Sequence, residues 1–144
     1  MTNYSTYVDW RRTFHQYPEL SDEEYETTEK LRKILKSYGI RILEVPLKTG
    51  LVAEIGQGEE MIAVRTDIDA LPIEEQVKHE FTSKYQGAMH ACGHDIHMAS
   101  ILATGIQLKE IEDELNGRVR LIFQPAEELG HGAFEIINTG VLKG

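Results

Sequence analysis

The stretch AMHACGHDIHMASILATGIQLKEIE, residues 88–112, joins residue types that bind metals to a strongly apolar segment. Its apolar part, residues 96–112, predicts a largely buried helix, and Gly105 within it indicates close packing against a neighbouring element. Residues 88–100 gather three histidines, an aspartate and the only cysteine of the chain: His90, Cys92, His94, Asp95 and His97. A fold that buries this helix therefore holds a cluster of thiol and imidazole groups at its start.

Helix and strand patterns alternate on both sides of this stretch. Ser21 and Glu24 form an S-x-x-E capping box, which predicts a helix from about residue 22 to residue 38. Residues 56–60 read as a hairpin-type turn, and the apolar run 61–64 predicts a strand that is buried on both faces. Shorter helices are expected at residues 7–15 and 133–140, and strands at residues 40–45, 51–56, 61–67 and 118–124. This order predicts an α/β layered domain around a mainly parallel or mixed sheet.

Length, charge and cysteine content limit the class of protein. The chain has 144 residues, which is typical of one domain, and its formal net charge of −9 disfavours binding to nucleic acid. The apolar runs are too short for a membrane-spanning helix and the N-terminus lacks a secretory signal, so we expect a cytoplasmic protein that does not bind membranes. A single cysteine has no internal disulfide partner; it is a packing residue, a reactive thiol or a metal ligand.

Acidic residues follow two of the predicted strands. Asp67 and Asp69 come at the end of the third strand, and Glu127 and Glu128 follow the fourth. In open α/β sheets binding sites gather beyond the carboxyl ends of the strands, so these carboxylates and the cysteine–histidine cluster can meet there. Adjacent glutamates point in different directions, so one can bind a metal while the other faces a substrate water. Metal-assisted hydrolysis needs this division, because the metal lowers the pKa of water and a carboxylate accepts its proton.

Cys92 and His94 are the strongest candidates for metal ligands. In an extended segment their spacing places both side chains on the same side, and Gly93 between them permits a tight turn. Thiolate and imidazole suit zinc, and also cobalt, nickel or manganese in mixed sites. A thiol nucleophile with His94 as its base is an alternative, although the spacing is poor for that pair. A closed structural zinc site would need four ligands, often in C-x-x-C pairs, which the sequence lacks.

Four segments, in this order, carry a resemblance to a known family: RRTFHQYPELSDEE (11–24), RTDIDALPIEE (65–75), MHACGHDIHMA (89–99) and FQPAEELGHGA (123–133). The chain resembles the metal-dependent N-acyl-amino-acid amidohydrolases of the metallopeptidase-like class, which include hippurate hydrolases, N-acetyldiaminopimelate deacetylases and plant auxin-conjugate hydrolases. The resemblance implies a three-layer α/β/α sandwich of the zinc-exopeptidase type. It further implies that residues 1–144 are the N-terminal part of a catalytic domain, without the lid and dimerisation domain of relatives.

The resemblance also implies roles for individual residues. Cys92, His94 and Glu128 correspond to ligands of a site for two divalent metal ions (Zn, Mn, Co or Ni), and relatives have two further histidine ligands downstream. Glu127 corresponds to the general base that activates water and later protonates the leaving amine. Asp69 corresponds to an acidic residue that supports the metal centre by orienting a ligand.

Three interpretations of function follow. The first is hydrolysis of the amide bond of a small N-acyl amino acid by a full-length parent that is a homodimer. The second is a catalytically incomplete fragment that binds metal weakly or not at all, and the third is a cysteine-dependent hydrolase that uses Cys92. We further expect Asp95 to orient His94 and His131 to be a surface or capping residue. His15 and Glu19 receive no chemical role, and His79 carries no signal.

Overall fold

Four strands of the computed structural model, which describes residues 4–143, form one mixed sheet in the order β1-β2-β4-β3. They are β1 (Arg41–Leu43), β2 (Leu51–Gly56), β3 (Met61–Asp67) and β4 (Arg118–Gln124). β2 runs antiparallel to both β1 and β4, whereas β3 runs parallel to β4 in a register that pairs Asp67 with Gln124. The carboxyl ends of β3 and β4 therefore lie side by side at one end of the sheet.

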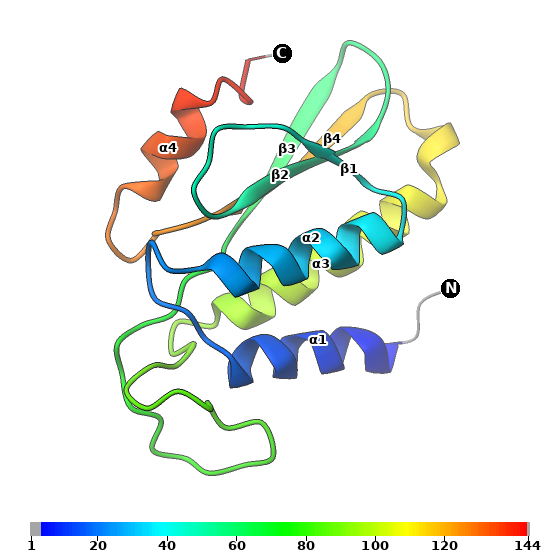
Figure 1. Ribbon diagram of the computed structural model, residues 1–144. Coiled ribbons are helices and arrows are strands. Elements are labelled where there is room, and N and C mark those ends of the chain that lie inside the picture. Colours follow the sequence, from blue (N-terminus) through cyan, green and yellow to red (C-terminus); the bar gives the residue numbers. More distant parts are fainter. Residues whose placement is uncertain (1–3, 144) are drawn as a thin grey trace.

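Helices cover both faces of the sheet (Figure 1). α1 (Tyr4–Gln16), α2 (Tyr25–Ser37) and α3 (His94–Glu110) lie on one face, α4 (Gly132–Asn138) lies on the other, and a short 3-10 turn, η1 (Glu112–Glu114), precedes β4. The larger apolar cluster joins the first three helices to the sheet and includes Phe14, Leu31, Leu35, Leu102, Ile106, Leu121 and Phe123. A smaller cluster on the opposite face contains Val52, Ile122, Ile136 and Val141. The three layers confirm the predicted fold class.

α3 lies close to the sheet because Gly105 carries no side chain. A Cβ atom at this position would lie 2.5 Å from Leu121 Cδ1 of β4 and within 4 Å of the side chains of Ile40 and Ile55. The prediction of close packing at Gly105 is confirmed.

None of the described helices combines the length and the apolar character that crossing a membrane requires.

The predicted start of the second helix was wrong. α2 begins at Tyr25, and the capping box is absent because Ser21 donates its hydroxyl to Asp69 Oδ2 at 2.7 Å while the Glu24 side chain is fully buried. Instead, the Glu19 carboxylate caps the helix, accepting hydrogen bonds from the backbone N–H groups of Glu26 (3.0 Å) and Thr27 (2.6 Å). Glu19 therefore has the role of an N-cap at a distance, contributed from the chain before the helix.

The predictions for residues 56–60 and 61–64 were also wrong. β2 and β3 do not form a hairpin, because β4 lies between them and pairs with both. β3 is consequently an edge strand, and its first half is largely exposed; Ile62 is 65 % exposed. The strand that is buried along its whole length is β2. β1 is shorter than the predicted 40–45 segment.

Candidate metal centre

The carboxyl ends of β3 and β4 meet the amino end of α3. β3 ends at Asp67, and the chain after β4 turns through Glu127 and Glu128 before α4 begins. α3 begins at His94, and the preceding residue, Gly93, has φ +84° in the left-handed region that favours glycine. Three segments that are far apart in the sequence therefore supply side chains to one place, as the strand-end rule predicted.

The structure brings Cys92, His94 and Glu128 together. One potential ligand atom from each residue lies within 4.8 Å of the other two. His94 is buried, Glu128 is half-buried and Cys92 is exposed, so the group lies at the surface end of the core rather than inside it. A thiol, an imidazole and a carboxylate in this arrangement form a donor set that suits zinc and related divalent ions.

Asp69 holds two members of this group in place. Its Oδ2 atom accepts a hydrogen bond from the Glu128 backbone N–H at 3.0 Å, in addition to the one from Ser21. Its backbone carbonyl accepts a hydrogen bond from His94 Nδ1 at 2.8 Å, which leaves His94 Nε2 facing the other carboxylates. Burial works against ionisation of Asp69, but hydrogen bonds from His94 and Ser21 outweigh it and lower its pKa to about 2.

Negative charge concentrates around His94 Nε2. Asp67 Oδ1 lies 3.5 Å away, Glu128 Oε1 3.7 Å and Glu127 Oε2 3.8 Å. Burial disfavours the imidazolium, but Asp69 and Asp67 outweigh it and raise the pKa of His94 to about 9. Glu128 Oε1 is buried and has no hydrogen-bond partner among the described residues. A buried carboxylate oxygen without a hydrogen bond, beside clustered negative charge, fits a divalent cation.

Asp95 does not orient His94, so that prediction was wrong. Its Oδ2 atom forms an ion pair with Arg11 Nε at 2.9 Å and accepts a hydrogen bond from His15 Nδ1 at 2.8 Å. These partners come from α1, about eighty positions earlier in the chain, and no local pattern indicated them. His15, which had no predicted role, is therefore part of the support behind α3.

His131 and His97 are two further histidines with carboxylate partners. His131 lies at the surface as expected, where it contacts Asp22 Oδ2 at 3.0 Å and Glu135 Oε1 at 3.2 Å. Sequence analysis placed His97 in the cysteine–histidine cluster but gave it no role, whereas the structure places its Nδ1 atom 2.8 Å from Asp67 Oδ1. The signal was present, since residues three apart share a face of a helix and His97 follows His94 by three.

Comparison with known proteins gives a consistent result. Residues 63–144 match the model of the peptidase family M20/M25/M40. The chain is 53 % identical over 140 residues to an N-acetylcysteine deacetylase from Bacillus subtilis, covering 95 % of the chain and 37 % of that protein. It is 44 % identical over 140 residues to an N-acyl-L-amino acid amidohydrolase from Geobacillus stearothermophilus, covering 95 % of the chain and 38 % of that relative.

A solved structure shares the fold. It is a dinuclear metal-binding peptidase of the M20 family from Bacillus subtilis, with a TM-score of 0.94 and 52 % sequence identity. The match covers 97 % of the chain and 40 % of the solved chain. The chain thus spans about two fifths of the length of these relatives.

Proposed function

Because the chain belongs to the peptidase family M20/M25/M40, we propose that residues 1–144 form part of the catalytic domain of a metal-dependent amidohydrolase. The substrate class is an N-acyl amino acid, in keeping with relatives named N-acetylcysteine deacetylase and N-acyl-L-amino acid amidohydrolase. The observation that carries the proposal is the convergence of Cys92, His94 and Glu128, in which the buried Oε1 atom of Glu128 has no hydrogen-bond partner among the described residues.

In this proposal Cys92, His94 and Glu128 are the residues of the chain that hold the metal centre. The name of the similar solved structure supports two ions in that centre. When bound, divalent ions supply polarisation of the scissile carbonyl and activation of water. Zinc, cobalt, nickel and manganese all suit a mixed set of sulfur, nitrogen and oxygen donors.

Glu127 is the proposed general base. Its side chain is 38 % exposed and its Oε2 atom lies 3.8 Å from His94 Nε2, so its carboxylate lies beside the donor set and remains open to a substrate. In this role Glu127 takes the proton from the attacking water and gives it to the leaving amine. Asp69 positions the ligands on either side, because it binds the backbone of Glu128 and the ring of His94.

The cysteine-dependent alternative has less support. Desolvation by neighbouring groups raises the pKa of the Cys92 thiol, and the adjacent Glu128 and Glu127 carboxylates raise it further. Catalytic cysteines have the opposite property, a pKa lowered by nearby positive charge. The environment of Cys92 therefore favours a thiolate that is stabilised by a metal over a free nucleophile. A strong chelator distinguishes the metal-dependent mechanism from the cysteine-dependent one, because only a cysteine-dependent enzyme would remain active after its metal is removed.

The test compares two neighbouring substitutions in the full-length protein. Glu127→Gln is expected to retain metal, because the substitution removes the base and spares the ligands. Its turnover of N-acetyl amino acids, with N-acetylcysteine as the first substrate to test, is expected to fall by about 10²–10⁴-fold. Glu128→Gln is expected to lose metal as well. Metal analysis and steady-state kinetics give the result, and equal loss of metal in Glu127→Gln would contradict its role as base. Sedimentation of the same protein tests the homodimer that the resemblance implies.

A further inference from the structure

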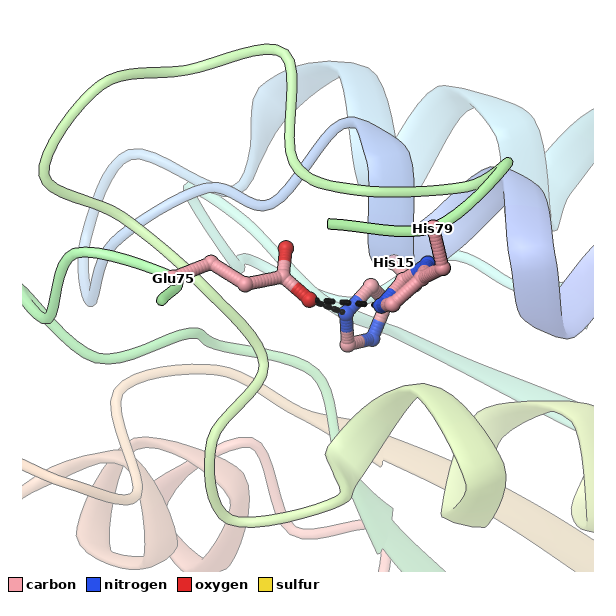
Figure 2. A group of neighbouring side chains, drawn as sticks. All are labelled: His15, Glu75 and His79. Carbon is pink, nitrogen blue, oxygen red and sulfur yellow. Dashed lines mark hydrogen bonds and ion pairs between the residues drawn. The ribbon is translucent and has the colours of Figure 1, made fainter. Parts of the chain in front are cut away.

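A second group of ligand-type side chains lies away from the candidate metal centre. His15, at the end of α1, and His79, in the segment between β3 and α3, both approach the carboxylate of Glu75 (Figure 2). Both Nε2 atoms point at the same oxygen, Glu75 Oε1, with distances of 2.9 Å for His15 and 2.8 Å for His79. Three ligand atoms from three residues thus converge within 4.8 Å of one another.

Each of the three residues is fixed by another group. His15 Nδ1 donates to Asp95 Oδ2 at 2.8 Å, so its Nε2 atom is aimed at the cluster. Glu75 Oε2 accepts the backbone N–H of Ser83 at 2.7 Å, which orients Oε1. The backbone N–H of His79 donates to the Thr82 hydroxyl at 2.7 Å. A carboxylate behind a ligand histidine and a hydrogen bond behind a ligand carboxylate are the usual supports of a metal site.

From these contacts we propose that His15, Glu75 and His79 form a further site for a divalent ion of the zinc type, distinct in its ligands from the candidate metal centre. Two imidazoles and one carboxylate are a common set of zinc donors, with a fourth position left for water. Bonds of about 2.0–2.1 Å in a tetrahedral site separate the donor atoms by about 3.3 Å, so the cluster needs to open by about half an ångström. The ion takes the place of the two protons that His15 Nε2 and His79 Nε2 direct at Glu75 Oε1, and these protons are released to solvent.

The His15–Glu75–His79 group is more buried than a group of surface side chains that lie near one another without binding an ion. The side chains of His15 and Glu75 are only 6 % and 5 % exposed, whereas the side chain of His79 is 29 % exposed, so an ion can reach the group from solvent beside His79. Asp22, His131 and Glu135 form a comparable trio, but all three are about 40 % exposed. Exposed groups of this kind are commonly solvated ion pairs that bind no metal. Substitution of His131 is therefore a matched control for substitution of His79.

The proposed ion would fasten a long irregular segment to the first helix. Residues 68–93 join β3 to α3 and form the long green loop beside the end of α1 in Figure 1. A hydrogen bond from Lys84 N–H to the Gln16 carbonyl, 2.8 Å long, already connects the two. Because this segment leads into Cys92 and α3, a bound ion would restrict the segment that carries part of the candidate metal centre.

The experiment counts metal equivalents in the full-length protein. Protein stripped with chelator is reloaded with Co²⁺ and freed of excess ion, and bound metal is measured for the wild type, His79→Gln, Glu75→Gln and His131→Gln. The wild type and His131→Gln are expected to bind one equivalent more than His79→Gln and Glu75→Gln. The sulfur-to-cobalt absorption that reports Cys92 should be equal in all four. Amide hydrogen exchange at residues 75–83 should slow on loading in the wild type but not in His79→Gln.

Two results would overturn the proposal: His79→Gln binding as much metal as the wild type, or His131→Gln losing an equivalent to the same extent. The first would leave the cluster as a hydrogen-bonded network, and the second would indicate unspecific binding by surface histidines. The readout is independent of the proposed function. If the sulfur-to-cobalt absorption is missing while the His79-dependent equivalent is present, the proposed metal centre fails and this inference stands.

Discussion

Glu24 is a buried carboxylate that stabilises the turn in which Glu127 and Glu128 lie. Its Oε1 atom accepts the Ala126 backbone N–H at 2.7 Å, and its Oε2 atom accepts the Thr49 hydroxyl at 2.8 Å. Ala126 has φ +48°, a conformation that costs a residue with a side chain about 1–3 kcal/mol. Glu24 thus fixes a strained residue directly before Glu127, and it acts on the site through the backbone.

Replacing Glu24 therefore has two distinguishable outcomes. Glu24→Ala should lower the free energy of unfolding by about 2–4 kcal/mol, because it leaves two buried donors without acceptors. Glu24→Gln should cost much less, since its amide oxygen can accept from Ala126 and the Thr49 hydroxyl can turn to accept from its amide nitrogen. Urea unfolding measures both. Equal losses in the two variants would show that the hydrogen bonds are not what Glu24 contributes.

The same carboxyl group predicts a pH dependence. Burial raises the pKa of Glu24 above its ordinary value of 4.5, so the folded state binds this proton more tightly than the unfolded state. The resulting stability is present below pH 4.5 and is lost as the pH rises through the raised pKa. Glu24→Gln cannot titrate, so the stability of this variant relative to the wild type should increase over that interval. A constant or opposite difference would contradict the sign.

At the scale of elements, α2 illustrates how a helix is capped by a residue that the local pattern does not indicate. Glu19 Oε1 and Oε2 accept the N–H groups of Glu26 and Thr27, and the negative charge also suits the positive end of the helix dipole. The S-x-x-E pattern failed because both of its side chains have buried partners elsewhere, Asp69 for Ser21 and Ala126 for Glu24.

Glu19→Ala should lower the free energy of unfolding by about 1–2 kcal/mol, because it removes both acceptors at the start of α2. Glu23→Ala is the matched control: it removes an exposed carboxylate of equal charge near the same helix start, and its effect should stay within about 0.5 kcal/mol. Chemical denaturation of both variants gives the comparison. If the control loses as much as Glu19→Ala, the effect comes from charge alone.

The elements that the sequence predicted well are those with a continuous apolar pattern. β2 and β4 begin and end where expected, and α3 and α4 agree within two residues. The rule that sites gather beyond strand ends also placed Cys92, His94 and Glu128 correctly near one another. The contacts that failed or were missed depend on distant partners, such as His15 with Asp95 or His15 with Glu75. The exposure of β3 depends on sheet order, which hydropathy does not encode.

At the scale of the whole molecule, negative charge is unevenly distributed. The chain has a formal net charge of −9, and Asp67, Asp69, Glu127 and Glu128 all gather near His94. Like charges at these separations repel one another, and a divalent cation would turn that repulsion into attraction. The stability of the protein should therefore depend on metal.

Removal of metal by a strong chelator should lower the midpoint of thermal unfolding. An ion at a hundred times its dissociation constant contributes about 2.7 kcal/mol through linkage. Added monovalent salt should restore part of the loss in the stripped protein, because it screens the repulsion between carboxylates. Scanning calorimetry with and without chelator provides the measurement. An unchanged midpoint after complete removal of the ions would exclude this coupling.

The position of β4 between β2 and β3 also governs how the chain can reach its native state. Leu51 pairs with Phe123 and Met61 with Arg118, so the edges of β2 and β3 that pair with β4 lack their partner until the ribosome has made residue 124, although β2 can pair with β1 earlier. During synthesis both strands wait with open edges, and such non-local pairing folds slowly. The nascent chain is therefore most vulnerable to aggregation just before β4 emerges, and chaperone capture should peak at that length.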